Sequence, residues 1–247
     1  MAYKKIMTDA DLKQRILDIC SKETCYLYGG IGQTLTLSVL NAKAKQLPSW
    51  YTEKRISALK ALINSGTKYT GFDCVGVIKS ILWGYGTDAG MKYASNTVPD
   101  TSANGFINCC EDVSTDMTNI KPMEVIWFSG HVGLYLYKKN GVDYCVECAP
   151  SINKVGITKM SYQGKWCKHG KMPWIEYGSI VEDNPVKSVQ AEINDLIAKG
   201  YISLPKLEED GIWGTKTATA WLTMQSYLLA KKKITHKDVA AMAGVEL

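Results

Sequence analysis

Thiol and imidazole groups are the side chains of this sequence best suited to covalent chemistry. A cysteine becomes a nucleophile when a base removes its proton, and near neutral pH that base is usually a histidine. The chain has more cysteines than histidines, so the position of each residue in its predicted element must decide which pair reacts. The cysteines are Cys20, Cys25, Cys74, Cys109, Cys110, Cys145, Cys148 and Cys167, and the histidines are His131, His169 and His236.

Cys74 is the cysteine best placed for catalysis, because it begins a predicted amphipathic helix with Asp73 as the N-cap. A helix N-terminus stabilises a thiolate through its free N–H groups and its dipole, so we expect a lowered pKa for this thiol. Cys20 lies near a predicted helix end, where the dipole has the opposite sign. Cys109 and Cys110 lie near the start of a weaker helical pattern and are followed by acidic residues, which would raise a thiol pKa.

His131 is the histidine best placed to act as the base, because it begins a predicted strand whose rigid end would hold the imidazole in position. His169 lies beside two lysines, which would disfavour a charged imidazolium, and His236 lies in the C-terminal tail. A third polar group should orient the imidazole. Glu147 lies inside the next predicted strand, where a carboxylate needs a partner. A hairpin turn at Asn140–Gly141 would bring it near His131.

The composition excludes several other classes of function. With 29 Lys and Arg against 24 Asp and Glu, the net charge is +5, which is too small for a dedicated nucleic-acid-binding protein. No apolar run approaches the ~18 residues of a membrane span, so we expect no membrane insertion. Cys145 and Cys148 form a C-x-x-C without further ligands at suitable spacing, so we expect no metal and no cofactor. The N-terminus does not resemble a secretory signal, which predicts synthesis in a reducing cytoplasm with free thiols.

Helical patterns precede strand patterns in the first 180 residues, which predicts an α+β fold with helices packed on an antiparallel sheet. Apolar spacing predicts helices at 9–22 and 52–64 besides the helix at Cys74. Strands are predicted at 125–128, 131–137, 144–149 and 155–160. A polar stretch at 178–185 then predicts a linker, so we expect domains at 1–180 and 186–247. The second domain would hold three helices, at 186–199, 215–229 and 235–243.

Four segments, read in order, resemble motifs of the NlpC-type papain-like cysteine peptidases of bacterial cell walls. Residues 26–30 (Tyr-Leu-Tyr-Gly-Gly) look like the family's Tyr-x-x-Gly-Gly motif. Residues 72–76 (Phe-Asp-Cys-Val-Gly) look like its Asp-Cys-Ser-Gly motif, with Val75 where Ser is usual. Residues 130–135 (Gly-His-Val-Gly-Leu-Tyr) are similar to its His-Val-Gly-Ile-Tyr strand. Residues 146–149 lie where the family places its third polar residue, commonly His, Asn or Gln rather than Glu.

The resemblance covers about residues 10–177 and implies a role for each matching residue. Cys74 would be the nucleophile, His131 the base and Glu147 the orienting group. The Tyr26 hydroxyl would lie near the oxyanion, while Asp73 would act mainly as a helix cap with an additional role in substrate binding. The implied activity is that of a bacteriophage endolysin, made in the host cytoplasm and acting on the peptidoglycan of the cell wall.

Two further features bear on the substrate. Residues 31–71 separate the first two motifs, where the family has a short segment, and this insertion resembles those of some bacteriophage lysins. The tail resembles a small three-helix peptidoglycan-binding module, above all in Asp-Gly-Ile-Trp-Gly at 210–214 and the following Thr217. That resemblance implies a wall contact for Trp213. The alternative is that the tail is a generic helical cap.

Several alternatives remain open on the sequence. The resemblance favours the γ-D-glutamyl–diamino acid bond, but the N-acetylmuramoyl–L-alanine amide is an alternative. An acyl- or peptidyl-transferase on the same scaffold is a second enzyme class. A non-catalytic wall-binding or phage-tail structural protein is a third reading, and it predicts that replacing Cys74 changes nothing. Mass spectrometry of digested peptidoglycan would name the bond.

Overall fold

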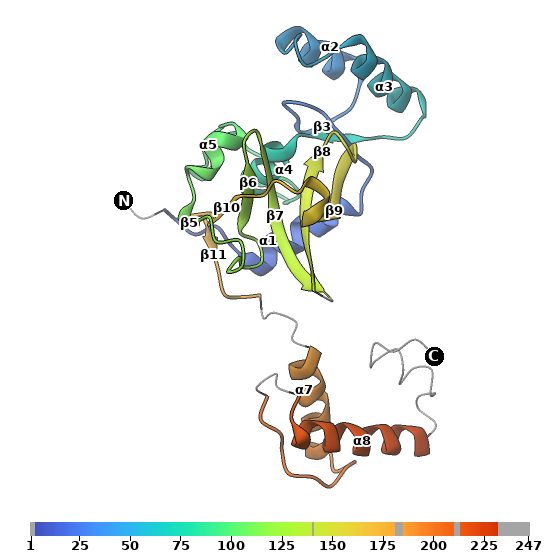
Figure 1. Cartoon of the computed structure of the whole chain (residues 1–247). Coiled ribbons are helices and arrows are strands. Elements are labelled where there is room, and N and C mark those ends of the chain that lie inside the picture. Colours follow the sequence, from blue (N-terminus) through green and yellow to red (C-terminus); the bar gives the residue numbers. More distant parts are fainter. Residues whose placement is uncertain (1–2, 140, 181–184, 210–212, 232–247) are drawn as a thin grey trace. The chain divides into compact units, whose positions relative to one another are not determined.

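The structure is a computed structural model that describes residues 3–139, 141–180, 185–209 and 213–231. The chain divides into two compact units, residues 1–180 and 181–247, and each unit is described by itself. The first unit has an α+β architecture, as predicted, with helices packed on an antiparallel sheet (Figure 1). The division between the units falls in the polar stretch of the sequence.

A six-stranded antiparallel sheet forms the centre of the first unit, with the strand order β5-β10-β6-β7-β8-β9. The four predicted strands are present as β6 to β9, and two strands were not predicted, β5 and β10. Both are four residues long and mostly polar, whereas β6, which is equally short, is a wholly apolar run that could be recognised. The strands are β5 (Glu111–Ser114), β6 (Val125–Phe128), β7 (His131–Lys139), β8 (Val142–Ala149), β9 (Lys154–Lys159) and β10 (Lys168–Lys171).

Three helices pack against this sheet and supply much of the main core (Figure 1). They are α1 (Asp9–Cys20), α4 (Cys74–Leu82) and α5 (Ala103–Ile107). Helix α1 begins at a capping box between Thr8 and Asp11, which satisfies its first backbone N–H groups. Every residue of α4 is buried, so this helix lies inside the unit rather than on its surface.

A second, smaller sheet has the strand order β2-β4-β3. Strand β2 (Thr24–Tyr26) runs parallel to β4 (Thr70–Phe72), and β3 (Ile31–Thr34) pairs with β4 in the antiparallel sense. The sequence motif at 26–30 suggested only a turn-rich segment here. The parallel pairing joins chain segments more than 40 residues apart, and therefore places the first motif beside the residues that precede Cys74.

The insertion forms a pair of helices with its own apolar cluster. Helix α3 (Glu53–Asn64) confirms the predicted helix at 52–64, whereas α2 (Leu37–Gln46) was not predicted. Figure 1 shows α2 and α3 together beyond the end of the small sheet. Their cluster has buried members on both helices and on the strand and loop beneath them: Cys25, Leu27, Leu35, Leu40, Tyr51 and Leu59.

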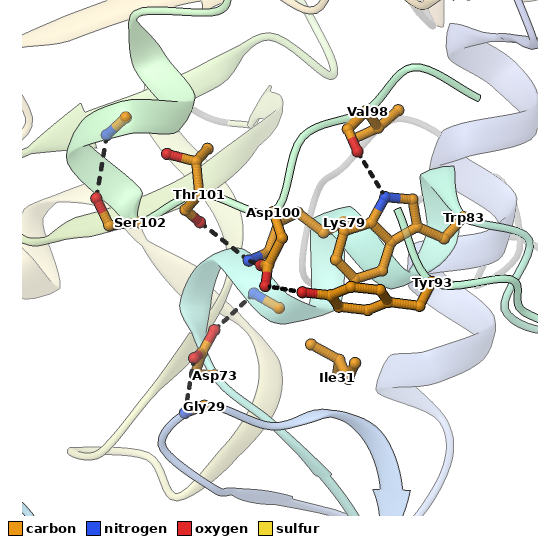
Figure 2. Close-up of polar contacts among 12 residues, drawn as sticks. Gly29, Ile31, Asp73, Lys79, Trp83, Tyr93, Val98, Asp100, Thr101 and Ser102 are labelled. Carbon is orange, nitrogen blue, oxygen red and sulfur yellow. Dashed lines mark hydrogen bonds and ion pairs between the residues drawn. The ribbon is translucent and has the colours of Figure 1, made fainter. Parts of the chain in front are cut away.

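The loop that follows α4 is tied to that helix by a buried lysine. Lys79 is 5% exposed and forms an ion pair with Asp100, and its ammonium group also donates to the Thr101 carbonyl at 2.9 Å (Figure 2). Tyr93 donates to the second carboxylate oxygen of Asp100 at 2.5 Å. The chain therefore returns to α4 before α5 begins.

The second unit contains α7 (Pro185–Ala198) and α8 (Thr215–Ala230), close to two of the three predicted tail helices. The third, at 235–243, lies outside the described residues. The side-chain amide of Asn194 binds the backbone of Leu207 in both directions, at 2.7 and 3.0 Å, and so fixes the segment between the helices. None of the described helices is both long and apolar enough to span a bilayer. Buried apolar residues of this unit are Ile193, Ile202, Leu207, Ala220, Trp221 and Met224.

The remaining elements are short. Strand β1 (Met7–Thr8) pairs in parallel with β11 (Ile175–Glu176), and α6 (Met160–Gln163) follows β9. Cys109 and Cys110 were expected near the start of a helix, but α5 ends at Ile107 and both cysteines follow it. The expectation was wrong, since the segment after the two cysteines forms strand β5 rather than a helix.

Candidate active site

Cys74 is the first residue of α4, as the sequence predicted, and Asp73 is its N-cap. One carboxylate oxygen of Asp73 accepts from the backbone N–H of Gly76 at 2.6 Å, and the other accepts from Gly29 at 2.8 Å (Figure 2). Asp73 is 9% exposed. Its carboxylate therefore caps the helix and also holds the loop of the first motif against it.

The close approach of these two loops requires glycine at position 76. A Cβ atom there would lie 1.9 Å from the carbonyl oxygen of Gly30, which no side chain tolerates. The backbone N–H of Asp73 donates to the same oxygen at 3.1 Å. The nucleophile motif and the Tyr-x-x-Gly-Gly segment are thus locked together backbone to backbone.

His131 and Glu147 form a buried pair, with Nε2 of His131 2.7 Å from Oε2 of Glu147. Glu147 lies opposite Gly133 on the neighbouring strand, and Gly133 shares a face of β7 with His131 because side chains alternate along a strand. The absence of a side chain at Gly133 leaves the carboxylate free to reach the imidazole. The predicted hairpin therefore brings the two residues together.

Two residues that the sequence did not reveal hold the Glu147 carboxylate in place. Thr158 on β9 donates to Oε1 at 2.6 Å, and Gln163 on α6 donates to Oε2 at 2.9 Å. Burial acts to raise the pKa of Glu147, but the hydrogen bonds from His131, Thr158 and Gln163 outweigh it and lower the pKa overall. Spacing along the chain carries no signal for either residue, since both become neighbours of Glu147 only through the strand register and the turn after β9.

The Glu147 carboxylate fixes the tautomer of the imidazole. An ionised carboxylate can only accept, so Nε2 of His131 carries the hydrogen and Nδ1 is left as the basic nitrogen. Two aromatic rings restrict the imidazole further: Phe128 lies 5.1 Å and Trp166 5.4 Å from it, measured between ring centroids. His131 is thereby prepared to accept one proton at one atom.

The thiol of Cys74 lies beside the start of β7. The backbone N–H of Val132, the residue after His131, acts on the sulfur together with the N–H groups of Val75 and Cys74 itself. Burial and the neighbouring Asp73 carboxylate nevertheless raise the pKa of Cys74 to about 12. The expectation of a lowered pKa was therefore wrong: the helix N-terminus does favour the thiolate, but the loss of solvent outweighs it.

Tyr26 also reaches this site from β2. Its side chain is buried, and burial raises its pKa far above the ordinary value. The nearby Cys74 and Asp73 side chains raise this pKa further. The hydroxyl therefore remains protonated and can donate. Trp213, expected to contact the wall, belongs to the second unit, where it is 49% exposed and its ring meets that of Trp221 edge to face at 6.0 Å.

His169 forms a second buried pair, away from the candidate site. Its Nδ1 lies 2.5 Å from a carboxylate oxygen of Glu124 and its Nε2 lies 3.1 Å from the carbonyl of Asp116. Both ring nitrogens are therefore engaged, one by a buried carboxylate and one by a backbone carbonyl. The sequence pointed only to the neighbouring lysines, because Glu124 is distant along the chain and reaches this ring only in the folded structure.

Replacing Glu124 with alanine should lower the free energy of unfolding by about 3 kcal/mol, because it leaves the buried His169 without its partner. Chemical denaturation monitored by tryptophan fluorescence measures the change. Glu111→Ala removes an exposed carboxylate from the adjacent β5 and serves as the control, with an expected change below about 0.5 kcal/mol. A loss under 1 kcal/mol for Glu124→Ala would show that the pair contributes little.

Within the described part of the chain, no three His, Cys, Asp or Glu side chains gather in a way that could hold a metal ion. All eight cysteines are present as free thiols in the structure. In comparisons with known proteins, no family model matches the chain, and no curated protein and no solved structure matches it.

Proposed function

We propose that this protein is an endolysin-type hydrolase that cleaves an amide bond of bacterial peptidoglycan with Cys74 as the nucleophile. The observation that carries the proposal is the buried His131–Glu147 pair, which leaves Nδ1 as the basic nitrogen, together with the Cys74 sulfur beside the backbone of Val132, the residue after His131. The choice of peptidoglycan and of a papain-like fold rests on the sequence resemblance. Of its amide bonds, we propose the γ-D-glutamyl–diamino acid bond.

In the proposed reaction, Nδ1 of His131 accepts the proton of Cys74 as the sulfur attacks the scissile carbonyl. The developing oxyanion is stabilised by the backbone N–H of Cys74, which is unpaired within the first turn of α4, and by the Tyr26 hydroxyl. The imidazolium then gives its proton to the leaving amine. Water, activated by the same imidazole, hydrolyses the thioester and restores the thiol.

Mass spectrometry of purified peptidoglycan after digestion tests this proposal directly. A new free amino group on the diamino acid names the γ-D-glutamyl bond, whereas a new amino terminus on L-alanine names the N-acetylmuramoyl–L-alanine amide. Release of free peptides in water without an added acceptor separates hydrolysis from transfer. If the wild-type protein releases no fragment, the proposal is wrong.

His131 should control the reactivity of the Cys74 thiol. With a pKa of about 12, an unassisted thiol holds only about one part in 10⁵ as thiolate at pH 7. We therefore expect His131→Asn to slow alkylation of Cys74 by iodoacetamide about 100-fold or more, measured by peptide mass spectrometry. The exposed Cys167 provides the internal control and should react equally fast in both proteins. Equal rates at Cys74 would show that His131 is not its base.

We also propose that the second unit binds the wall, with the exposed Trp213 as a contact residue. The sequence resemblance carries this proposal, and the packing of Trp213 against the buried Trp221 supports a fixed orientation for its ring. Deleting residues 186–247 should abolish sedimentation of the protein with purified walls while soluble substrates are still cleaved. Unchanged sedimentation would contradict this proposal and favour the alternative, that the tail is a generic helical cap.

A further inference from the structure

A pocket of about 190 Å³ lies beside the candidate site, and the insertion supplies most of its wall. Trp50, Tyr51 and Arg55 line it from the insertion, while Tyr26 and Tyr28 line it from the first motif. Tyr26 connects the two places, because its side chain lines the pocket and is also near enough to Cys74 for their charges to interact. The pocket and the nucleophile therefore share a neighbouring residue.

The pocket contains an ordered stack of three side chains. The rings of Tyr28 and Trp50 are stacked with their centroids 4.3 Å apart and 25° between their planes. The guanidinium carbon of Arg55 lies 3.9 Å from the centroid of the Trp50 ring, and Nη1 of Arg55 donates to the Trp50 carbonyl at 2.6 Å. Trp50 therefore holds the guanidinium through both its ring and its backbone.

The insertion is also anchored to the first motif at this point. The Tyr51 hydroxyl donates to the carbonyl of Tyr28 at 2.7 Å, and Lys43 on α2 donates to the carbonyl of Gly29 at 2.5 Å. These contacts tie the stack to the loop that Asp73 holds against α4. A short chain of hydrogen bonds thus sets the position of the Arg55 guanidinium relative to Cys74.

The positive charge of Arg55 has no acidic partner among the residues that the structure describes. Asp73, a buried carboxylate whose charge acts on the pocket residue Tyr51, has both oxygens engaged by backbone N–H groups. One guanidinium nitrogen is bound to Trp50, which leaves the other N–H groups for a ligand. Their planar fork matches the two oxygens of a carboxylate.

We propose that this pocket binds the acyl half of the substrate and that Arg55 pairs with a carboxylate there. The inference rests on the proposed function and deepens it. A γ-linked glutamyl residue leaves its α-carboxylate free on the acyl side of the scissile amide, where an ordinary α-linked peptide has no charge. Arg55 therefore selects γ-glutamyl substrates with a free α-carboxylate over those in which it is an amide.

Two synthetic peptides test this selection, L-Ala-γ-D-Glu-L-Lys and its counterpart with an α-carboxamide on the glutamyl residue. The wild-type protein should cleave the carboxylate peptide with a kcat/KM about tenfold or more above that of the amide. Arg55→Gln should reduce kcat/KM for the carboxylate peptide by a similar factor and leave the amide peptide within about twofold. Lys60→Gln, which removes an exposed charge from the same helix outside the pocket, should change neither.

The outcomes separate the two proposals. If wild-type protein cleaves both peptides equally, or if Arg55→Gln weakens both by the same factor, the pocket proposal is wrong while the hydrolase proposal stands. If wild-type protein cleaves neither peptide, the assigned bond is wrong and the pocket proposal falls with it. Calorimetric titration of the Cys74→Ala protein with L-Ala-γ-D-Glu gives a second readout, since adding Arg55→Gln should weaken binding about tenfold.

Discussion

Replacing Cys74 with alanine should abolish peptidoglycan cleavage, lowering kcat by about 10⁴-fold or more. Removing a nucleophile leaves only the contribution of binding and of the oxyanion donors, so losses of this size are typical of a catalytic unit. The fold should survive, because the substitution removes a single sulfur atom from a residue that is buried at the start of α4. Release of soluble fragments from purified walls, followed by mass spectrometry, measures the effect.

Cys109→Ala is the matched control for this experiment. Cys109 is a half-buried thiol just after helix α5, and its sulfur donates to the Gly105 carbonyl. Its replacement should leave kcat unchanged. A Cys74→Ala protein that still cleaves walls at the wild-type rate would rule out the proposed chemistry and favour a non-catalytic protein.

Replacing Glu147 with glutamine should lower kcat by about 10³-fold, with little change in KM. Glutamine has nearly the same volume, but its amide does not impose the tautomer of His131 in which Nδ1 is the base, and the analogous change in a Ser–His–Asp triad costs about 10⁴-fold. Thr158→Val provides a graded comparison, because it removes one of the three groups that hold the carboxylate. A Glu147→Gln protein with wild-type kcat would show that the carboxylate is merely structural.

The effect of Glu147→Gln on the free energy of unfolding should also depend on pH. Because the folded-state pKa of Glu147 lies below its ordinary value of 4.5, the carboxylate stabilises the protein fully above that value, and this stabilisation is lost as the pH falls through the folded pKa. The difference in unfolding free energy between wild type and Glu147→Gln should therefore be largest near neutral pH and shrink in acid. Denaturant titrations at pH 7 and pH 3.5 measure it.

The sequence predicted those elements that carry a clear apolar pattern. Helices α1, α3 and α4 have apolar residues at helical spacing, and strands β6 to β9 are rich in apolar residues. The start of α4 and the β7–β8 hairpin followed from local signals. Strands β2, β3 and β4 have three or four residues, and what stabilises them is pairing with distant segments. Such short strands show no period of their own.

The candidate site was predictable in its members but not in its electrostatics. Spacing pointed to Cys74, His131 and Glu147, because each lies at an element end or a strand position that can be recognised locally. The raised pKa of Cys74 follows from burial, which depends on everything packed around α4. Likewise, Thr158 and Gln163 reach Glu147 only through tertiary structure.

The sparse burial of the insertion has a consequence for how the molecule binds ligands. Leu40 is the buried residue of α2 and Leu59 that of α3, whereas α4 is buried along its whole length. Helices of this length are marginal alone, so the α2–α3 pair should open at a lower free-energy cost than the fully buried α4. Trp50 lies in the loop that joins these helices and Arg55 lies on α3, so filling the pocket and ordering the insertion should be one linked equilibrium. A substitution that loosens α3 would then weaken binding without touching a single residue of the pocket.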